Sequence, residues 1–450
     1  MKVGFVSLGC SKNLVDTEKT IGVFKSNGYE IVVDSKEAEV IVINTCGFIE
    51  KAKEEAINTI LEMSEYKKRK CKYLIVMGCL VERYKNELIK AIPEVDLFIK
   101  YSEYNTLWQQ IENLLTGKKQ IEDNKYSAFE DIKERIISTG NNYAYLKIAD
   151  GCSNRCTYCA IPYIRGPQIS RKKEDILEEA NKLVKDGYQE LILIAQDTTK
   201  YGIDIYGKPM ISQLLKELCK IKDLHWIRFL YAYPENIDDE LIKVVKENSK
   251  ICKYFDIPIQ HISDKVLKMM NRKSNGKSIR ELIKKLRKEI SNVVIRTTVM
   301  VGFPGETKDD FEELYDFLKE TKFDKLGCFE YSREDGTSAA RMEKQIHPMT
   351  KKSRYNKIMS LQQKISKENL QSQIGKNVEV FIEEKINNKI YIGRTYMDVP
   401  EIDGVAYLKT DKNIDIGHFT RAKIVDVDEY NMYVEDIEKW ENRKQSVICV

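Results

Sequence analysis

The chain is 450 residues long, and 42% of its residues are hydrophobic and 9% are aromatic. This composition is sufficient for packed cores and excludes a disordered tail or a fibrous protein. At roughly 100 to 200 residues per domain, the length favours three domains. The 74 Lys and Arg residues exceed the 70 Asp and Glu residues by only four, so the chain lacks the strong basic excess of a non-specific nucleic-acid-binding protein.

No segment approaches the roughly 18 consecutive apolar residues that a membrane span requires, and residues 1–9 have the pattern of a strand rather than of a signal peptide. We therefore expect no membrane association and a cytoplasmic location. There the 11 cysteines would stay reduced, which indicates metal or redox chemistry before disulfides. Because the chain has only 4 histidines, a zinc site built from Cys and His is a poor alternative.

Three cysteines of the first hundred residues each follow a predicted strand directly. Short apolar runs alternate there with helix-length segments, which is typical of a parallel α/β sheet. Because the carboxyl ends of parallel strands lie at one edge of the sheet, where ligands bind, Cys10, Cys46 and Cys79 can converge at that edge. The predicted strands are Val3–Gly9, Tyr29–Val33, Glu39–Thr45, Tyr73–Gly78 and Val95–Ile99.

The rest of the chain divides into a linker, a second strand and helix series, and a terminal barrel. Gly117–Gly140 is charged and without apolar periodicity, so it reads as a linker. Six strands follow and suit an open or partial parallel barrel. Beyond Thr350 we expect a long polar helix, and then a small antiparallel barrel whose first hairpin turns at Asn387 and Asn388. The six strands are predicted at Tyr143–Ala149, Glu190–Gln196, Trp226–Tyr233, Tyr254–Gln260, Val293–Gly302 and Lys325–Ser332. The predicted units are residues 1–117, a linker at 118–140, a core at 141–368 and a barrel at 371–440.

A second cysteine set, Cys152, Cys156 and Cys159, lies in the loop after the first strand of the second series. Three thiolates leave one iron of a four-iron cluster without a protein ligand, so a substrate or cofactor can coordinate there. A structural zinc would require a fourth Cys or His nearby, and the next cysteine is Cys219. The spacing therefore favours an iron–sulfur cluster with one open iron. The remaining cysteines belong to no spaced set, and we interpret them as buried thiols.

The run GCSNRCTYC around these cysteines resembles the signature of radical S-adenosylmethionine enzymes. Gly151–Gly166, followed by Ser170 and Arg171, and the segment Arg296–Thr307 resemble the methylthiotransferase family. The amino-terminal cysteines fit the same family, and the final barrel looks like a TRAM domain, so the resemblance covers nearly the whole chain. It implies an α/β protein with an N-terminal parallel α/β domain, a central partial (β/α) radical S-adenosylmethionine barrel, and a C-terminal small antiparallel β-barrel that is OB-like.

The resemblance also implies the cofactors, which are two 4Fe-4S clusters and S-adenosyl-L-methionine. The set in the second domain would hold the cluster that binds S-adenosylmethionine, and the amino-terminal set would hold an auxiliary cluster that carries the sulfur of the product. The alternative for the amino-terminal set is three buried apolar thiols, since free cysteine is among the most buried residues. The implied ligands are Cys152, Cys156 and Cys159 for the first cluster and Cys10, Cys46 and Cys79 for the second.

Candidate residues for binding S-adenosylmethionine lie at the strand ends of the second domain. We expect Gln196, Asp197, Gln260 and Arg296 at carboxyl ends of strands that face the same mouth, although a polar residue there is often only a loop anchor. The segment from Gly302 to Glu306 lacks the spacing of a nucleotide phosphate loop. The resemblance implies that this segment packs near the adenosine part of the cofactor, and the alternative is a plain turn with a helix cap.

Several segments resemble the branch of the family that modifies ribosomal protein S-twelve rather than the branch that modifies a tRNA adenosine. They are Gly9–Asn13, Ala195–Gly202, Tyr254–Ser263 and Tyr331–Ala339. The implied reaction places a methylthio group on the β-carbon of an aspartate, after a 5′-deoxyadenosyl radical has removed hydrogen from that unactivated carbon. The required electron would come from a donor such as flavodoxin or ferredoxin.

Two alternatives stay open: a tRNA adenosine methylthiotransferase, and a non-catalytic iron–sulfur redox protein. The second is disfavoured because electron-transfer clusters are normally fully ligated by protein. Residues 376–440 contain fourteen acids and nine bases, a net charge of −5 that would repel RNA phosphates and attract a basic ribosomal protein. We therefore expect ribosomal protein S-twelve, free or in the small subunit, as partner and no stable nucleic-acid binding. An ordinary acidic surface without a partner is the alternative.

Overall fold

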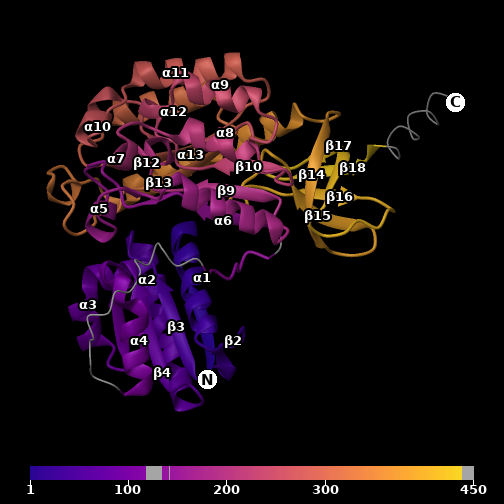
Figure 1. Ribbon diagram of the computed structural model, residues 1–450. Helices are drawn as coiled ribbons and strands as arrows, with labels where there is room; N and C mark the ends of the chain where they lie inside the picture. Colours follow the sequence, from indigo (N-terminus) through magenta and orange to yellow (C-terminus); the bar gives the residue numbers. More distant parts are fainter. Residues whose placement is uncertain (118–133, 141, 438–450) are drawn as a thin grey trace.

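The computed structural model describes residues 1–117, 134–140 and 142–437. Figure 1 shows an amino-terminal domain below a larger central domain, with a C-terminal barrel on the right-hand side of the central domain. Of the helices in these ranges, none is long and apolar enough to cross a membrane.

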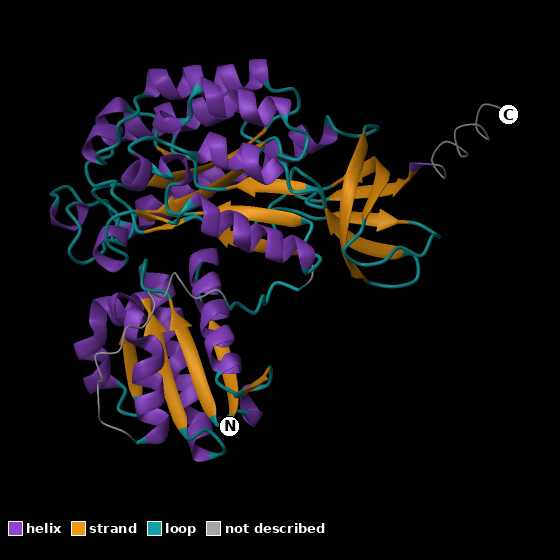
Figure 2. Cartoon of the chain, viewed as in Figure 1, coloured by secondary structure: helices purple, strands orange, loops and turns teal. Residues whose placement is uncertain are grey.

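The amino-terminal domain is a five-stranded parallel sheet in the order β2-β1-β3-β4-β5. Helices α1 and α4 pack on one face of the sheet and α2 and α3 on the other (Figure 2). Because both faces are covered, the central strands β3 and β4 are buried along nearly their whole length and are mainly apolar. The strands are β1 (Lys2–Ser7), β2 (Glu30–Val32), β3 (Val40–Thr45), β4 (Tyr73–Gly78) and β5 (Leu97–Lys100), and the helices are α1 (Ser11–Ser26), α2 (Glu50–Ser64), α3 (Cys79–Ala91) and α4 (Leu107–Thr116).

The central domain contains two three-stranded parallel sheets, β6-β9-β10 and β11-β12-β13. A parallel bridge between Ile227 and Ile251 lies where β10 approaches β11, so the six strands form the partial barrel that the sequence predicted. The strands are β6 (Tyr143–Lys147), β9 (Glu190–Ile194), β10 (Trp226–Phe229), β11 (Tyr254–Gln260), β12 (Val294–Val301) and β13 (Lys325–Glu330), and the small pair β7 (Ala149–Asp150) and β8 (Ile169–Ser170) lies beside them.

Helices cover the outside of the partial barrel, and their apolar faces bury one large core against the strands. They are α6 (Lys173–Lys185), α8 (Ile211–Cys219), α9 (Asp239–Glu247), α11 (Gly276–Glu289), α12 (Lys308–Thr321) and α13 (Pro348–Gln371), with the short helices α5 (Ile161–Ile164), α7 (Ile203–Tyr206) and α10 (Asp264–Met269). Helix α13 is the long polar helix predicted beyond Thr350, and Pro348 at its first turn suits a helix start.

The C-terminal domain is a closed five-stranded barrel in the order β14-β15-β16-β18-β17. Its predicted hairpin is present, because the side chain of Asn387 accepts hydrogen bonds from the amides of Lys389 and Ile390. One strand pair, β16 with β18, is parallel, so the barrel is antiparallel at every pairing except this one. Its strands are β14 (Asn377–Lys385), β15 (Ile390–Arg394), β16 (Ala406–Lys409), β17 (Phe419–Val427) and β18 (Met432–Asp436).

The end of the predicted linker is part of a domain contact. Residues 118–133 lie outside the described ranges, but Arg135 bonds to Glu18 of α1 at 2.5 Å and to Glu179 of α6 at 2.8 Å. The residues just before β6 therefore bind the amino-terminal domain to the central one. The domain boundaries at 1–117, 141–368 and 371–440 stay predictions.

Candidate active site

The amino-terminal cysteines lie at one edge of the first sheet, after three adjacent strands. Cys10 is the cap residue of α1, Cys46 follows β3 and Cys79 begins α3 after β4. Gly9 precedes the first of them with a φ of +90°, and a Cβ at this position would lie 2.6 Å from the Cβ of Cys46. Only glycine permits this backbone conformation and this close approach, so the sequence brings the three thiols together.

The electrostatic setting of these thiols suits metal ligation. Burial raises the pKa of Cys79 to about 12 and also raises that of Cys46, while Arg165 of the central domain opposes both increases. The Cys79 thiol donates to Asn13 Oδ1 at 3.5 Å, and Cys10 is the exposed member. Three thiols beside a buried cation are a donor set that fits a cluster, because cluster ligands are thiolates and carry negative charge.

The second cysteine set lies in the loop that follows β7. Cys152 and Cys156 are buried and Cys159 is half-buried, and burial raises the pKa of Cys159 to about 12. The loop turns sharply at Gly151, whose φ is +69° and where a Cβ would lie 2.1 Å from the carbonyl oxygen of Pro167. The amide of Cys152 then donates to the carbonyl of Gly166 at 3.0 Å, which closes the loop around the thiols.

Arg272 lies beside the second set and was not identified from the sequence. Its Nη1 is 3.9 Å from Cys156 Sγ, its guanidinium lies 4.3 Å from the ring centre of Tyr233, and its Nε is buried without a hydrogen-bond partner. An unpartnered buried donor next to three thiols fits an anionic cluster. Nothing in the sequence marks this arginine, because it is 116 residues from the cysteine that it contacts.

Neither set is arranged for a single metal ion. Within the described ranges, no three Cys, His, Asp or Glu side chains lie close enough together to ligate one ion. A four-iron cluster is larger than one ion and holds its thiolates farther apart. The composition of each set, three cysteines without a fourth ligand, is the composition of a cluster site with one open iron.

Three of the candidate cofactor residues lie at the carboxyl ends of strands, as expected. Gln196 and Asp197 follow β9, and Gln260 is the last residue of β11, with a φ of +68°. Gln196 donates to Asp150 at 3.1 Å and its Oε1 is buried without a partner. Burial raises the pKa of Asp197, which accepts a hydrogen bond from Asn154 in the cysteine loop at 2.9 Å. Asp197 therefore contacts the loop of the second set, and the role of all three residues in cofactor binding stays a prediction.

The placement of Arg296 differs from the prediction. It is the third residue of the eight-residue strand β12, nearer to its amino end than to its carboxyl end. Its Nη1 pairs with Asp256 of β11 at 2.9 Å, and its Nε is 3.9 Å from Asp403 of the C-terminal barrel. The strand predicted at Val293–Gly302 already has Arg296 as the fourth of its ten residues, so the sequence itself placed this arginine away from the carboxyl end. Arg296 therefore lies lower in the barrel than Gln196 and Gln260.

The segment from Gly302 to Glu306 forms a tight loop before α12. Gly302 has a φ of +72°, and the carboxylate of Glu306 accepts a hydrogen bond from the amide of Phe303 at 2.9 Å. Arg354 of α13 approaches Glu306 Oε1 to 2.9 Å, yet burial raises the pKa of this carboxyl to about 7. Thr307 caps α12 through a reciprocal pair of bonds with Asp310. The loop thus has the turn and helix cap that the sequence analysis gave as the alternative to a cofactor contact. Contact of this loop with a cofactor stays a prediction.

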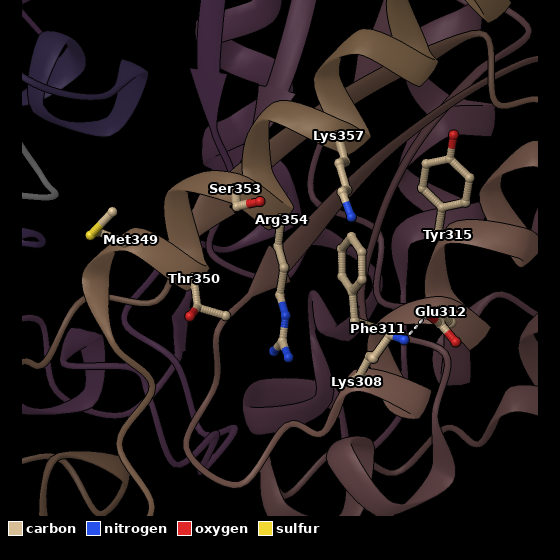
Figure 3. Close-up of a pocket in the computed structure, with 9 residues that line it drawn as sticks. All are labelled: Lys308, Phe311, Glu312, Tyr315, Met349, Thr350, Ser353, Arg354 and Lys357. Atoms are coloured by element: carbon tan, nitrogen blue, oxygen red, sulfur yellow. Dashed lines mark ion pairs between the residues drawn. The ribbon is translucent and has the colours of Figure 1, made fainter.

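A surface pocket of about 790 Å³ lies between α12 and α13 (Figure 3). Phe311 and Tyr315 come from α12, and Arg354 and Lys357 come from α13. Through Arg354 the pocket touches the loop of Glu306. None of the six cysteines of the two sets lines it, so it is not the candidate active site.

A buried polar network connects the two cysteine sets. Arg165 donates to Asp150 at 2.7 and 3.0 Å, to Asp16 of α1 at 2.9 Å and to Asn13 of α1 at 2.6 Å. Lys147 at the end of β6 bonds to Asp16 and to Asp150, each at 2.8 Å. Asn13 contacts Cys79, and Asp150 accepts the amide of Gly151, which precedes Cys152. A continuous chain of polar contacts therefore runs from one set to the other.

Comparison with known proteins agrees with this architecture. Residues 2–100 match the uncharacterized protein family UPF0004, residues 146–318 match the Radical SAM superfamily, and residues 374–437 match the TRAM domain. A protein of Alkaliphilus oremlandii named ribosomal protein uS12 methylthiotransferase RimO is 61% identical, covering 97% of this chain and 99% of that protein. A protein of Caldicellulosiruptor saccharolyticus with the same name is 52% identical, covering 97% of this chain and 100% of its own.

Among solved structures, the radical S-adenosylmethionine methyltransferase TsrM from Kitasatospora setae matches with a TM-score of 0.58 at 12% identity. The match covers 75% of this chain and 73% of that one. OxsB, a cobalamin-dependent S-adenosylmethionine radical enzyme, matches with a TM-score of 0.51 at 14% identity, covering 81% of this chain and 56% of its own. At these identities the likeness concerns the fold alone.

Proposed function

This chain belongs to the RimO family of radical S-adenosylmethionine methylthiotransferases, and we propose that it methylthiolates ribosomal protein uS12, the S-twelve of the sequence analysis, at the β-carbon of an aspartate. The observation that carries the proposal is identity of 61% across 97% of the chain, together with two three-cysteine sets joined by one buried network. The enzyme class follows from the family. The particular aspartate carbon is the part that the proposal adds.

The family uses 4Fe-4S clusters and S-adenosyl-L-methionine, and the residues present fit both. In our proposal Cys152, Cys156 and Cys159 hold the cluster that binds S-adenosylmethionine. The amino-terminal set would hold the auxiliary cluster. Bound there, these groups would pass on an electron received from an external donor and would supply the hydrogen-abstracting radical and the methylthio group.

The chain's own part is to bind, orient and exclude water. Arg272 has a buried hydrogen-bond donor beside the second cysteine set. Gln196 and Asp197 have polar side chains just after the carboxyl end of β9. Gln260 has a left-handed backbone conformation, which a residue with a side chain adopts only where the surrounding structure holds it. We propose that these residues, with Gly302 and Glu306, form the S-adenosylmethionine pocket, and that Arg296 supports it from deeper in the barrel.

The experiment that tests the function is mass spectrometry of uS12. The reconstituted enzyme with a reductant, S-adenosylmethionine and a sulfur source should add one methylthio group to an aspartate-containing peptide of uS12. A parallel digest of tRNA should show no methylthioadenosine. If tRNA were modified and uS12 were not, the chain would belong functionally to the tRNA branch.

Cluster content gives a second test. Replacing Cys152, Cys156 and Cys159 with Ala should remove about half of the iron and abolish formation of 5′-deoxyadenosine, since each set ligates its own cluster. The same replacement of the amino-terminal set should also remove about half of the iron but leave 5′-deoxyadenosine detectable. Loss of all iron from either triple variant would show one shared site instead of two.

The C-terminal barrel keeps part of its acidic excess at the surface. Of its described acids, Glu384, Glu401, Asp411, Asp415 and Asp426 are exposed, Glu379, Glu383, Asp403, Asp428 and Glu429 are half-buried, and Asp398, Glu435 and Asp436 are buried. Of its described bases, Lys376, Lys385, Lys389, Lys409, Lys412 and Arg421 are exposed, Lys423 is half-buried and Arg394 is buried. The expectation that the barrel attracts uS12 by net charge stays a prediction. Our proposal of uS12 as substrate rests on the relatives, and the absence of stable nucleic-acid binding and the cytoplasmic location stay predictions.

A further inference from the structure

A buried lysine of the amino-terminal domain extends across to the central domain. Lys12 is the second residue of α1 and comes two residues after Cys10. Only 5% of this lysine is exposed, and its Nζ lies 3.1 Å from the ring centre of Tyr231. Lysine is almost never buried in this way unless its charge is compensated. The ammonium of Lys12 therefore lies inside the contact between the two domains.

Tyr231 places this ammonium at the mouth of the central barrel. It follows the carboxyl end of β10 and has a φ of +62°. Its carbonyl accepts the amide of Thr198 at 3.2 Å. Thr198 follows Asp197, which accepts a hydrogen bond from Asn154 in the loop of the second cysteine set. Lys12 thus extends from the start of α1 toward the strand ends that contact the second set.

The positive charge of Lys12 is not balanced by an acid of the protein. Among the described residues, no carboxylate and no hydrogen-bond acceptor bonds to its Nζ. Asp16, one turn further along α1, accepts hydrogen bonds from Lys147 and Arg165 instead. A cation–π contact offsets only part of the cost of burying an ammonium. An anionic group bound beside Lys12 would therefore be stabilised by this charge.

A second buried donor lies in the same helical turn. The hydroxyl of Ser11 is buried and has no hydrogen-bond partner in the part of the chain that the structure describes. The cap residue Cys10 makes no side-chain capping bond, and the first turn of α1 contains no acid. Such a helix start favours an anion, and hydroxyl and ammonium groups are donors that bind a carboxylate. This end of α1 therefore suits a carboxylate ligand.

Each cysteine set already has another cation. Arg165 opposes the increase that burial causes in the pKa of Cys79, and Arg272 lies 3.9 Å from Cys156 Sγ. Within the described ranges, no hydrogen bond joins Lys12 to a cysteine, and its recorded contact is with Tyr231. A substrate carboxylate that enters a site from which water is excluded requires a cation of its own. The position of Lys12 therefore favours the substrate over the two clusters.

We propose that Lys12 binds the side-chain carboxylate of the aspartate that is modified and is a specificity-determining residue of the enzyme. The inference rests on the proposed function, in which the β-carbon of this aspartate must lie within reach of both cysteine sets. The carboxylate is bonded directly to that carbon and keeps its charge in the product. A cation that holds the carboxylate therefore also fixes the position of the reacting carbon. No bond to Lys12 forms or breaks.

The test compares the full-length holoenzyme with two neutral variants, Lys12→Met and Lys12→Gln, and with Lys12→Arg, which keeps the charge. The matched control is Lys25→Met, at the exposed far end of the same helix. The probes are uS12 and a form of uS12 whose modified aspartate, identified by mass spectrometry of the wild-type product, is changed to Asn. Titration calorimetry measures the affinity for each probe. Iron content and the KM values for uS12 and for S-adenosylmethionine are measured with dithionite as reductant.

Wild type should bind uS12 about 10- to 100-fold more tightly than the Asn form, because the Asn form lacks a charge-assisted hydrogen bond. The neutral variants should bind both forms equally, and about as weakly as wild type binds the Asn form. Their KM for uS12 should rise by a similar factor with iron content as in wild type. Lys12→Arg should still prefer the aspartate form, and Lys25→Met should behave as wild type.

A neutral variant that kept the wild-type preference for aspartate over Asn would overturn the inference. Loss of iron from the folded variants would assign Lys12 to a cluster, and a rise of the KM for S-adenosylmethionine alone would assign it to the cofactor, and either result would overturn it as well. So would failure of both neutral variants to fold, because Lys12 would then serve the domain contact. If wild type left uS12 unmodified, the proposed function would fail instead. A wild type that modifies uS12 but binds its Asn form equally well would overturn this inference alone.

Discussion

The central domain meets its two neighbours through buried ionic networks at opposite ends of its strands, and the two contacts differ in kind. Toward the amino-terminal domain the network is Asn13, Asp16, Lys147, Asp150 and Arg165, at the carboxyl end of β6 and beside both cysteine sets. Its members contact one another and the cysteine loops. This network therefore positions a site as well as a domain.

Toward the C-terminal barrel the network lies at the amino ends of the strands. Glu190, the first residue of β9, pairs with Arg228 at 2.9 Å and with Arg394 at 2.7 Å, and Arg394 also pairs with Glu383. Trp226 of the central domain packs against Phe419 of the barrel, with ring centres 4.7 Å apart. None of these residues approaches a cysteine of the two sets, so this contact serves the fold. The two contacts show that the role of a buried ion pair depends on its neighbours. Beside the cysteine sets it can position a site, and away from them it holds two domains together.

The largest effect should come from breaking the network at the C-terminal barrel. Glu190→Gln leaves Arg228 and Arg394 buried with one compensating charge removed, and removing one partner of such a pair costs about 3–5 kcal/mol. Chemical denaturation of the holoenzyme measures this loss. Dithionite-supported cleavage of S-adenosylmethionine per folded molecule should be unchanged.

The matched control is Lys389→Gln. Lys389 pairs with Asp411 at 3.4 Å, and both side chains are more than half exposed. A pair of this kind contributes less than about 1 kcal/mol. If Glu190→Gln cost no more than this control, the network would not hold the barrel in place.

The network at the cysteine sets should affect the reaction more than the stability. Arg165→Lys keeps the charge but loses the geometry that joins Asp150, Asp16 and Asn13. A displacement of about 1 Å between the two sets would lower the methylthiolation rate by about 100-fold. Cleavage of S-adenosylmethionine requires only the second set and should fall much less. The ratio of 5′-deoxyadenosine to modified uS12 should therefore increase.

Arg135→Lys provides the control for this prediction. Arg135 lies in the same domain contact and is also buried, but it bonds to Glu18 and Glu179, away from the cysteines. This variant should lose stability without a change in the product ratio. Pulsed electron paramagnetic resonance between the two reduced clusters gives a direct check, because only Arg165→Lys should change or broaden their separation. Equal ratios in both variants would mean that the network has no positioning role.

Much of the site could be predicted because the positions of the cysteines follow from strand order. Cys10, Cys46 and Cys79 each follow an apolar run, and parallel strands place such residues at one edge. The cysteines of the second set are close in sequence, so their spacing alone brings them together. The six strands of the central domain were also recognisable, since strands buried on both faces are mostly apolar, although Lys147, Arg228, Asp256 and Arg296 interrupt four of them.

The charged residues inside the protein could not be predicted. Asp16, Lys147 and Arg165 are buried and lie far apart in sequence, and a charged residue in a sequence normally indicates an exposed position. The same rule counted Asp398 toward the surface charge of the C-terminal barrel, although Asp398 is buried against Lys325 of β13. Some of these buried pairs lie within the central domain and others cross a domain contact, and chain order does not show which charges will pair.

We expect the charge of both networks to stay constant near neutral pH. The smallest predicted effect is therefore the change of the unfolding free energy with pH. Arg165 and Lys147 hold the pKa of Asp150 far below its usual range, and Arg394 and Arg228 lower the pKa of Glu190 in the barrel network. Both interfaces should therefore keep their strength between pH 6 and 8. Glu306 lies outside both networks and differs, because burial raises its pKa to about 7.

An acid whose pKa is higher in the folded chain than in the unfolded chain stabilises the fold at low pH, and this contribution is lost as the pH rises through the folded value. Between pH 6 and 8 the wild type should accordingly lose about 1 kcal/mol of unfolding free energy through Glu306. Glu306→Gln cannot titrate, so the difference between variant and wild type should change by this amount over the same interval. Glu190→Gln, measured in the same way, should differ from wild type equally at both pH values. The contrary outcome would be a difference in unfolding free energy that changes with pH for Glu190→Gln and stays constant for Glu306→Gln. A titrating group would then lie in the contact with the C-terminal barrel, and the contrast between the two networks would fail.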